Sequence, residues 1–197
     1  HIKEVTGGGA ALFDYDNDSD LDLYVVQGSA VEGNALFENV GGIFVNRSQS
    51  SGADDNGYGI GVATGDYDND GDVDLYVTNI GVNALLRNDG NGKFTDVTTF
   101  SGTEDEGFSA CSAFGDLDGD GDLDLVVTKY LDSALITDRE CLDAHSQRTY
   151  CNPTIYDAPM PDTLFINNGD GTFTDATESS GLASVKGTGL GVFISDL

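Results

Sequence analysis

Three copies of one acidic motif of nine residues constrain this chain more than any other feature. Each copy has aspartate at positions 1, 3, 5, 7 and 9, and together they hold fifteen of the chain's 35 acidic residues. The aspartates are Asp14, Asp16, Asp18, Asp20 and Asp22; Asp66, Asp68, Asp70, Asp72 and Asp74; and Asp116, Asp118, Asp120, Asp122 and Asp124. Side-chain oxygens at positions 1, 3, 5 and 9, with the backbone carbonyl of position 7, can surround one hard cation. The motif therefore predicts a calcium loop.

A solvated acidic turn is the alternative, because Asp, Asn and Gly favour turns with or without a metal. Five like charges within nine residues repel one another, however, and no run of Lys or Arg lies nearby to balance them. Magnesium fits less well, since it retains its waters and requires a strict octahedron. Transition metals are disfavoured because no loop contains His or Cys. We expect about three calcium ions, one in each loop.

The residues after each loop exclude the EF-hand. That motif requires a bidentate Glu at position 12 and flanking helices, whereas position 12 is here Val25, Val77 or Val127. Each valine lies in a run of β-branched, aromatic and aliphatic residues, which is typical of a strand. The acidic loops are therefore expected to connect strands.

Composition limits the classes of partner. The chain has 197 residues and a formal net charge of -27. Such a charge opposes binding to nucleic acids and to anionic membranes. No apolar stretch approaches the length of a membrane-spanning helix, so membrane insertion is not expected.

Two further motifs recur with the loops, at a period of about fifty residues. Residues 34–45, 83–97 and 162–176 each form a predicted hairpin with a turn rich in Gly, Asn or Asp. Residues 8–13, 59–64, 109–114 and 189–194 alternate small and apolar side chains, which is typical of a strand that other backbones approach closely. Four strands per period predict an all-β fold built from the four-stranded blades of a β-propeller.

The spacing of these motifs also predicts the repeat boundaries. We expect one partial β-propeller over residues 1–197, with repeats near 1–50, 51–100 and 101–180 and the start of a fourth at 181–197. The longer third repeat contains an insertion over residues 130–162.

The chain resembles the FG-GAP/VCBS repeat proteins, which include the calcium-binding blades of the integrin α-subunit, and most closely the secreted group similar to cartilage acidic protein. The resemblance is clearest at residues 8–18 (GGAALFDYDND), 58–72 (YGIGVATGDYDNDGD) and 167–175 (NNGDGTFTD). It implies metal ligands at the loop positions given above. It also implies a propeller of about seven blades, of which this chain supplies three and a fraction. The chain is thus expected to be a fragment of a longer polypeptide or to associate with copies of itself. Two departures are Ser19, in place of Gly at position 6, and Gly119, in place of Asn at position 4.

The three cysteines favour an exported protein. Cys141 and Cys151 flank nine residues of the insertion, and a disulfide between them would hold a loop that has little other support. The resemblance also implies cysteines at these places. Cys111 lies in a predicted strand and is expected to be a small buried apolar residue.

The sequence favours a binding function over catalysis. It contains two histidines and neither a Gly-x-Ser-x-Gly elbow nor a His-Glu-x-x-His motif. We expect a non-enzymatic, calcium-binding module that is secreted or lies at the cell surface. It would serve interaction, adhesion or structural assembly, with a protein or glycan partner or through self-association into an oligomer or filament. The alternative is the propeller part of a carbohydrate-active enzyme, because propellers place chemistry at the central channel.

Overall fold

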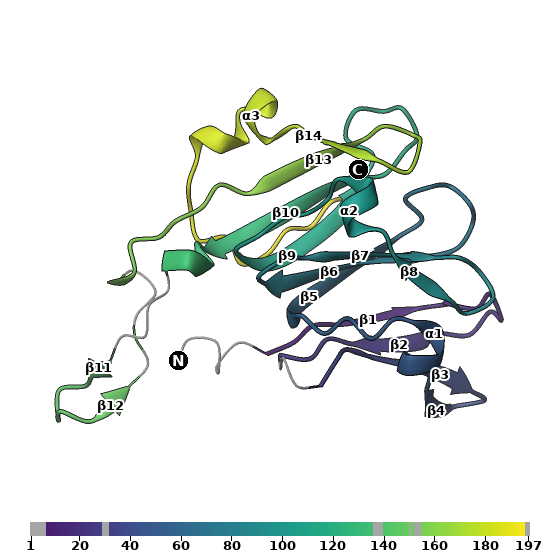
Figure 1. The fold of residues 1–197 in the computed structure, drawn as a ribbon, viewed down its shortest axis with the longest axis horizontal. Coiled ribbons are helices and arrows are strands. Elements are labelled where there is room, and N and C mark those ends of the chain that lie inside the picture. The colour runs from purple at the N-terminus through teal and green to yellow at the C-terminus, as the bar shows by residue number, and fades with distance from the viewer. Residues whose placement is uncertain (1–6, 29–31, 136–139, 150, 152–154, 196–197) are drawn as a thin grey trace.

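The computed structural model describes residues 7–28, 32–135, 140–149, 151 and 155–195. A fourth acidic loop that would begin at Asp196 lies outside these residues. The fold is all-β and propeller-like. Three antiparallel units of four strands follow one another along the chain and lie side by side (Figure 1).

The first repeat is a separate sheet of four strands, each paired with the next one in the chain. The strands are β1 (Ala10–Phe13), β2 (Asp22–Val25), β3 (Ala35–Val40) and β4 (Ile43–Asn46). All three pairings are antiparallel. The acidic loop is therefore the first connection of one meander, and the predicted hairpin forms its last two strands, β3 and β4.

The second and third repeats have the same order of strands. The second contains β5 (Tyr58–Gly65), β6 (Asp74–Ile80), β7 (Ala84–Asn88) and β8 (Phe94–Asp96). The third contains β9 (Phe108–Gly115), β10 (Asp124–Leu131), β13 (Thr163–Asn167) and β14 (Phe173–Asp175). One backbone pairing, between Ile80 and Phe108, joins the two repeats into a single sheet of eight strands.

The core lies between successive repeats and follows the two-residue alternation of strands. In β2 and β3, Tyr24 and Leu36 are fully buried against the second repeat. On β6, Leu75 and Val77 face the first repeat, whereas Tyr76 between them packs against the third. The second repeat thus buries both faces of its sheet, which explains the consecutive apolar residues of β6 (Leu75, Tyr76 and Val77) and of β7 (Ala84, Leu85 and Leu86).

A short helix follows the last strand of each repeat, a feature that the sequence motifs did not predict. The helices are α1 (Ser48–Ser51), α2 (Thr98–Ser101) and α3 (Thr177–Ser180). Their first residue carries a hydroxyl that accepts a hydrogen bond from the backbone N–H of the third strand, as Thr98 Oγ1 does from Leu85 at 2.9 Å. Each helix ends at a glycine with positive φ, which glycine adopts without steric cost.

The first strand of each repeat (β1, β5 and β9) is called its inner strand. The predicted fourth copy of the inner strand, at residues 189–194, is not a strand. This segment still runs beside β9, where a Cβ on Gly115 would lie 2.6 Å from Ile194. It therefore occupies the place that β5 and β9 take beside the preceding inner strands. Each inner strand forms its ladder with the second strand of its own repeat, and the described residues contain no such partner for residues 189–194. A strand is defined by that pairing, which explains the difference from the prediction.

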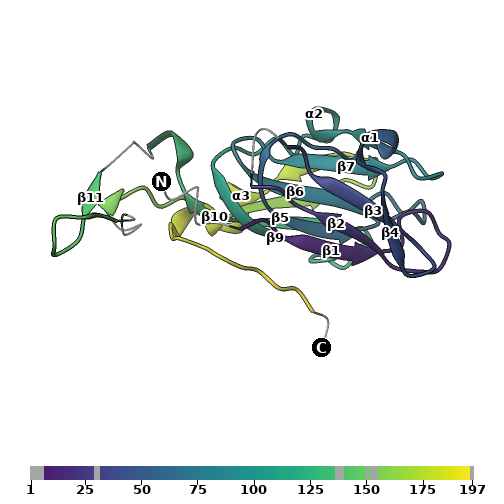
Figure 2. The same ribbon diagram turned by 90° about the horizontal axis from the view of Figure 1, so that it is seen from below.

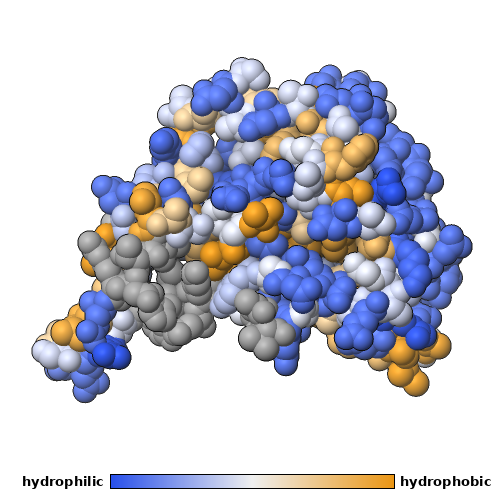
Figure 3. All heavy atoms as spheres, viewed as in Figure 1, coloured by the Kyte–Doolittle hydropathy of each residue, from blue (hydrophilic) through white to orange (hydrophobic). Residues whose placement is uncertain are grey.

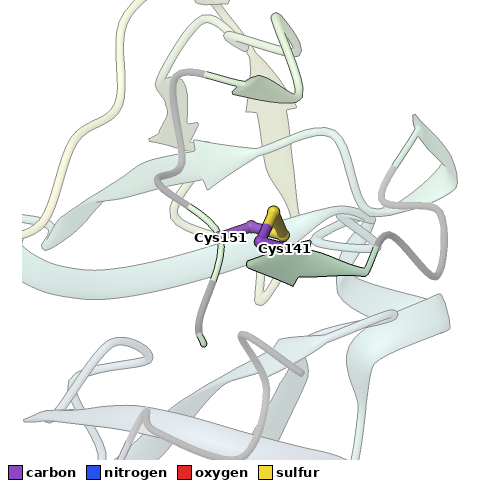
Figure 4. Close-up of a disulfide and its surroundings, with 2 residues drawn as sticks. All are labelled: Cys141 and Cys151. Carbon is purple, nitrogen blue, oxygen red and sulfur yellow. A yellow bond between two sulfur atoms is a disulfide. The ribbon is translucent and has the colours of Figure 1, made fainter. Parts of the chain in front are cut away.

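The insertion in the third repeat extends away from the stacked sheets (Figure 2). It begins after β10 with a 3-10 helix, η2 (Ser133–Leu135), and contains β11 (Cys141–Leu142) paired with β12 (Arg148–Thr149). A second 3-10 helix, η4 (Leu182–Ser184), follows α3. The predicted disulfide is present and joins Cys141 to Cys151 (Figure 4). It closes the small β11–β12 hairpin onto the following chain.

Candidate metal centre

The three acidic loops occupy the same place in each repeat. Residues 14–22 join β1 to β2, residues 66–74 join β5 to β6, and residues 116–124 join β9 to β10. The last aspartate of each motif is the first residue of the second strand. Because the two flanking strands pair in antiparallel register, the two ends of each loop lie side by side and its side chains are brought together.

The first aspartate of each motif organises the turn. Asp66 accepts hydrogen bonds from the backbone N–H groups of Asp70 and Gly71, at 3.1 and 3.0 Å. Asp14 accepts the equivalent bonds from Asp18 and Ser19. These bonds fold the loop back on its first carboxylate and draw positions 1, 3 and 5 together.

The last aspartate is buried and ties the loop to the hairpin. Asp74 accepts hydrogen bonds from the backbone N–H groups of Tyr67 and Asn88, at 3.0 and 2.7 Å. Asp22 and Asp124 accept the equivalent pairs of bonds in the other repeats. Burial raises the pKa of Asp74 to about 8, against the effect of these two bonds. Position 9 therefore fixes the loop in the fold, whatever else it binds.

Carboxylates converge in each loop at the separation that one calcium ion requires. Three groups have ligand oxygens within 4.8 Å of one another, namely Asp14, Asp16 and Asp18; Asp66, Asp68 and Asp70; and Asp116, Asp118 and Asp124. Oxygens bound to one calcium at about 2.4 Å lie no more than about 4.8 Å apart. In the third loop the position-9 carboxylate belongs to the group and that of Asp120 does not. The other predicted aspartates lie in the same loops.

Buried carboxylate oxygens without hydrogen-bond partners indicate whether the loops suit a cation. Among the described residues, Oδ1 of Asp16, of Asp20 and of Asp68 is buried and has no hydrogen-bond partner. A buried polar atom without a partner is costly, and a carboxylate oxygen more so. A hard cation would satisfy the oxygens of Asp16 and Asp68 directly, so the residues present fit calcium.

Burial and mutual repulsion also raise the pKa values of these groups. Loss of hydration is the larger cause for Asp16, Asp68 and Asp118, and the neighbouring carboxylates of the same loop add to it. The calcium-free loop is thus electrostatically unfavourable. A bound divalent cation reverses the effect of each neighbouring negative charge.

The two departures from the motif have different consequences. Ser19 has φ of 74°, where Gly71 and Gly121 have 94° and 97°. The serine therefore adopts a backbone conformation that strains a residue with a Cβ. Gly119 has φ of 84° and matches Asn17 and Asn69, which have 60° and 57°. Asn tolerates this region, so the loop geometry is conserved at position 4 in all three repeats.

Asparagines outside the loops were missed as site residues, although they end each predicted hairpin strand. Asn88 is fully buried, and its Nδ2 donates to the backbone carbonyl of Tyr15 in the preceding loop at 2.9 Å. Asn167 donates in the same way to Tyr67 at 2.7 Å. Their recurrence at one position of the repeat was the available signal.

A polar hollow lies away from the acidic loops. It has a volume of about 860 Å³, and Ala35 and Phe37 are among the residues that line it. The counterparts of these residues in the second repeat, Ala84 and Leu86, are buried against the first repeat. The hollow therefore lies on the face of the first repeat that no described repeat covers.

Comparison with known proteins identifies the repeated unit. The profile of the FG-GAP-like repeat family matches the chain twice, at residues 14–77 and 66–127. The two matches together span more than half of the chain and include all three acidic loops. No curated protein matches the chain. No helix among the described residues is long and apolar enough to cross a membrane.

Proposed function

Because the chain belongs to the FG-GAP-like repeat family, we propose that it is a calcium-binding interaction module of the cell exterior. The family matches support FG-GAP repeats and do not extend to the narrower group similar to cartilage acidic protein. The observation that carries the proposal is the convergence of carboxylates, some with buried and unpartnered oxygens, at one place in each repeat.

In each loop we assign the side chains of positions 1, 3, 5 and 9 and the main-chain carbonyl of position 7 as ligands. The aspartates are Asp14, Asp16, Asp18, Asp20 and Asp22 in the first loop, with the equivalent sets from Asp66 and from Asp116. The bound ion would supply positive charge that holds the mutually repelling carboxylates together. Its role is structural, since it fixes the connection between the first two strands of each repeat.

The insertion is the best candidate for partner contact. It extends from the stacked sheets (Figure 2). Within it, Leu135, Leu142 and Ile155 are exposed apolar side chains. Exposed apolar residues on an insertion that contains a disulfide suit a protein or glycan partner. The disulfide and the family membership support an extracellular, secreted or cell-surface location.

Calorimetric titration of the chelator-stripped chain tests the assignment. We expect about three calcium sites and much weaker binding of zinc. Fewer than two calcium sites, or zinc binding at equal affinity, would contradict it.

The interaction role has a separate test. A variant in which a short Gly-Ser linker replaces residues 132–162 should still bind calcium and should lose binding to panels of extracellular proteins and glycans. Retained binding would remove the insertion from the interface. Turnover of a glycan would instead favour the carbohydrate-active enzyme.

A further inference from the structure

Successive acidic loops are linked by a hydrogen bond between their side chains. Nδ2 of Asn17, at position 4 of the first loop, donates to Oδ1 of Asp72, at position 7 of the second loop, at 2.6 Å. Asn69 donates to Asp122 of the third loop at 2.7 Å. The same two positions are thus joined at both repeat interfaces, although they lie more than fifty residues apart in the chain.

The hairpin turn of its own repeat also limits where the acceptor carboxylate can lie. A Cβ on Gly90 would lie 2.9 Å from Oδ2 of Asp72, and a Cβ on Gly169 would lie 2.7 Å from Oδ2 of Asp122. Both glycines are in hairpin turns and have positive φ. The turn therefore leaves room for the carboxylate on one side, while the asparagine of the preceding loop holds it on the other.

The first loop shows the position-7 side chain without this donor. Within the described residues no preceding loop faces Asp20, and its Oδ1 is buried without a hydrogen-bond partner. Asp72 and Asp122 each have one Oδ1 partner in the preceding loop. The cross-repeat bond is thus associated with a different environment for the position-7 carboxylate.

We propose that Asn17 and Asn69 are positioning residues that couple neighbouring calcium loops, so that calcium in one loop raises the affinity of the next. The inference rests on the proposed calcium binding. Asn17 lies between Asp16 and Asp18, so ordering of these two ligands orients its amide. The amide then holds the side chain of Asp72, whose main-chain carbonyl is the assigned ligand of the second loop. Coupling acts equally in both directions, because linkage is reciprocal.

Calcium calorimetry on Asn17→Gly tests the coupling, with stepwise constants fitted for the whole chain. Glycine removes the amide and keeps the positive φ. We expect about a fivefold loss in one of the later binding steps, at the low end of typical coupling between sites, because the bond is exposed. Asn69→Gly should give an equivalent loss. Asp72→Ala keeps the main-chain carbonyl and should itself lower affinity, but Asn17→Gly should cause no further loss in that background.

Asn91→Gly is the matched control, since Asn91 also has positive φ and lies in an exposed hairpin turn. It should leave the titration unchanged. The melting temperature in EDTA checks that each variant folds. The coupling proposal is contradicted if Asn17→Gly titrates like Asn91→Gly, or if its loss of affinity adds in full to that of Asp72→Ala. Neither result would contradict the assignment of the calcium sites. If the unmodified chain binds no calcium, the proposed function itself fails.

Discussion

Tyr15, the second residue of the first acidic loop, stacks on Phe94 of β8 in the next repeat, with ring centroids 6.5 Å apart and planes at 18°. Tyr67 and Phe173 make the equivalent contact between the second and third repeats, with ring centroids 5.6 Å apart and planes tilted by 34°. The tyrosine of the first and of the second loop thus covers the outer hairpin of the following repeat. The metal loop and the core between repeats are parts of one interface.

This contact is incomplete at both ends of the stack. Phe44, the counterpart of Phe94 and Phe173, is 47% exposed, whereas those two are each 7% exposed. At the other end Leu117, the counterpart of Tyr15 and Tyr67, is also 47% exposed. Apolar atoms gather near the labelled β3–β4 hairpin in the space-filling view (Figure 3; compare Figure 1). These two faces correspond to the faces that pack together between neighbouring repeats. Among the described residues, no further repeat packs against either of them.

We therefore expect the isolated chain to associate, because uncovered apolar sheet faces are unfavourable in water. Phe44→Asp should shift the population toward the monomer in light scattering. The matched control is Ile43→Asp, which adds the same charge at a neighbouring residue that is 69% exposed and points to the opposite face. A monodisperse monomer of 20.6 kDa, well folded in calcium, would contradict the expectation.

Removing one carboxylate ligand should lower stability more in calcium than in EDTA. Asp66→Ala or Asp116→Ala should reduce the free energy of unfolding by about 2.7 kcal/mol at calcium near a hundred times the dissociation constant. Thermal melts in calcium and in EDTA measure this difference, with the exposed Glu178→Ala as the control for loss of one acidic side chain. Equal destabilisation in both buffers would mean that these aspartates act through something other than the ion.

The first loop should bind calcium most weakly, because Ser19 has positive φ and carries a Cβ. Relief of about 1 kcal/mol of strain in Ser19→Gly should tighten that site about fivefold. The reverse change, Gly71→Ser, should weaken the second site by a similar factor. Stepwise calorimetric constants measure both effects. If Ser19→Gly left every constant unchanged, strain at position 6 would not limit the affinity.

Lys129 and Asp105 form a buried ion pair in the third repeat, with side chains 1% and 13% exposed and Nζ and Oδ1 2.5 Å apart. Asp105→Ala should lower the free energy of unfolding by about 3–5 kcal/mol, because Lys129 would be left buried without its partner. Denaturant titration measures the loss. The control is Glu140→Ala, which removes the exposed pair with Arg148 and should cost under about 1 kcal/mol.

Loss of packing around Asp105 is the other explanation for destabilisation by Asp105→Ala. Lys129→Met combined with Asp105→Leu removes both charges and should recover most of the stability. Failure of this double variant to exceed Asp105→Ala would show that the loss comes from packing and not from the unpaired charge.

Acid should stabilise the calcium-free protein. Burial raises the pKa of Asp74 from 3.8 to about 8, so the folded state keeps a proton that the unfolded chain releases. This contribution is complete below pH 3.8 and is lost as the pH rises through about 8. Calcium must compete with that proton, so calcium affinity should increase across the same window.

Calorimetry in two buffers with different ionisation enthalpies measures the competition. Calcium binding at about pH 6 should release protons, and Asp74→Asn should reduce that release. Melts in EDTA should show higher stability near pH 5 than near pH 8. Absence of proton release would mean that Asp74 is already ionised in the folded protein.

Local chemistry allowed the sequence alone to predict the loops and their surroundings. The spacing of Asp66, Asp68 and Asp70 identified a turn that gathers oxygens, and Val77 showed that a strand follows it. The repeat period predicted four-stranded units, because alternation and turn residues are local signals. The spacing of Cys141 and Cys151 indicated the disulfide.

Contacts between repeats were decided only by the tertiary structure, because each joins residues that are far apart in sequence. No local pattern shows that Asn88 would reach the carbonyl of Tyr15, or that Asn17 would reach Asp72. The segment at residues 189–194 has the same pattern as the three inner strands, yet it forms none, since a strand requires a partner to complete its backbone hydrogen bonds. Sequence thus determined the repeating unit, whereas stacking of the units determined which of its polar groups meet.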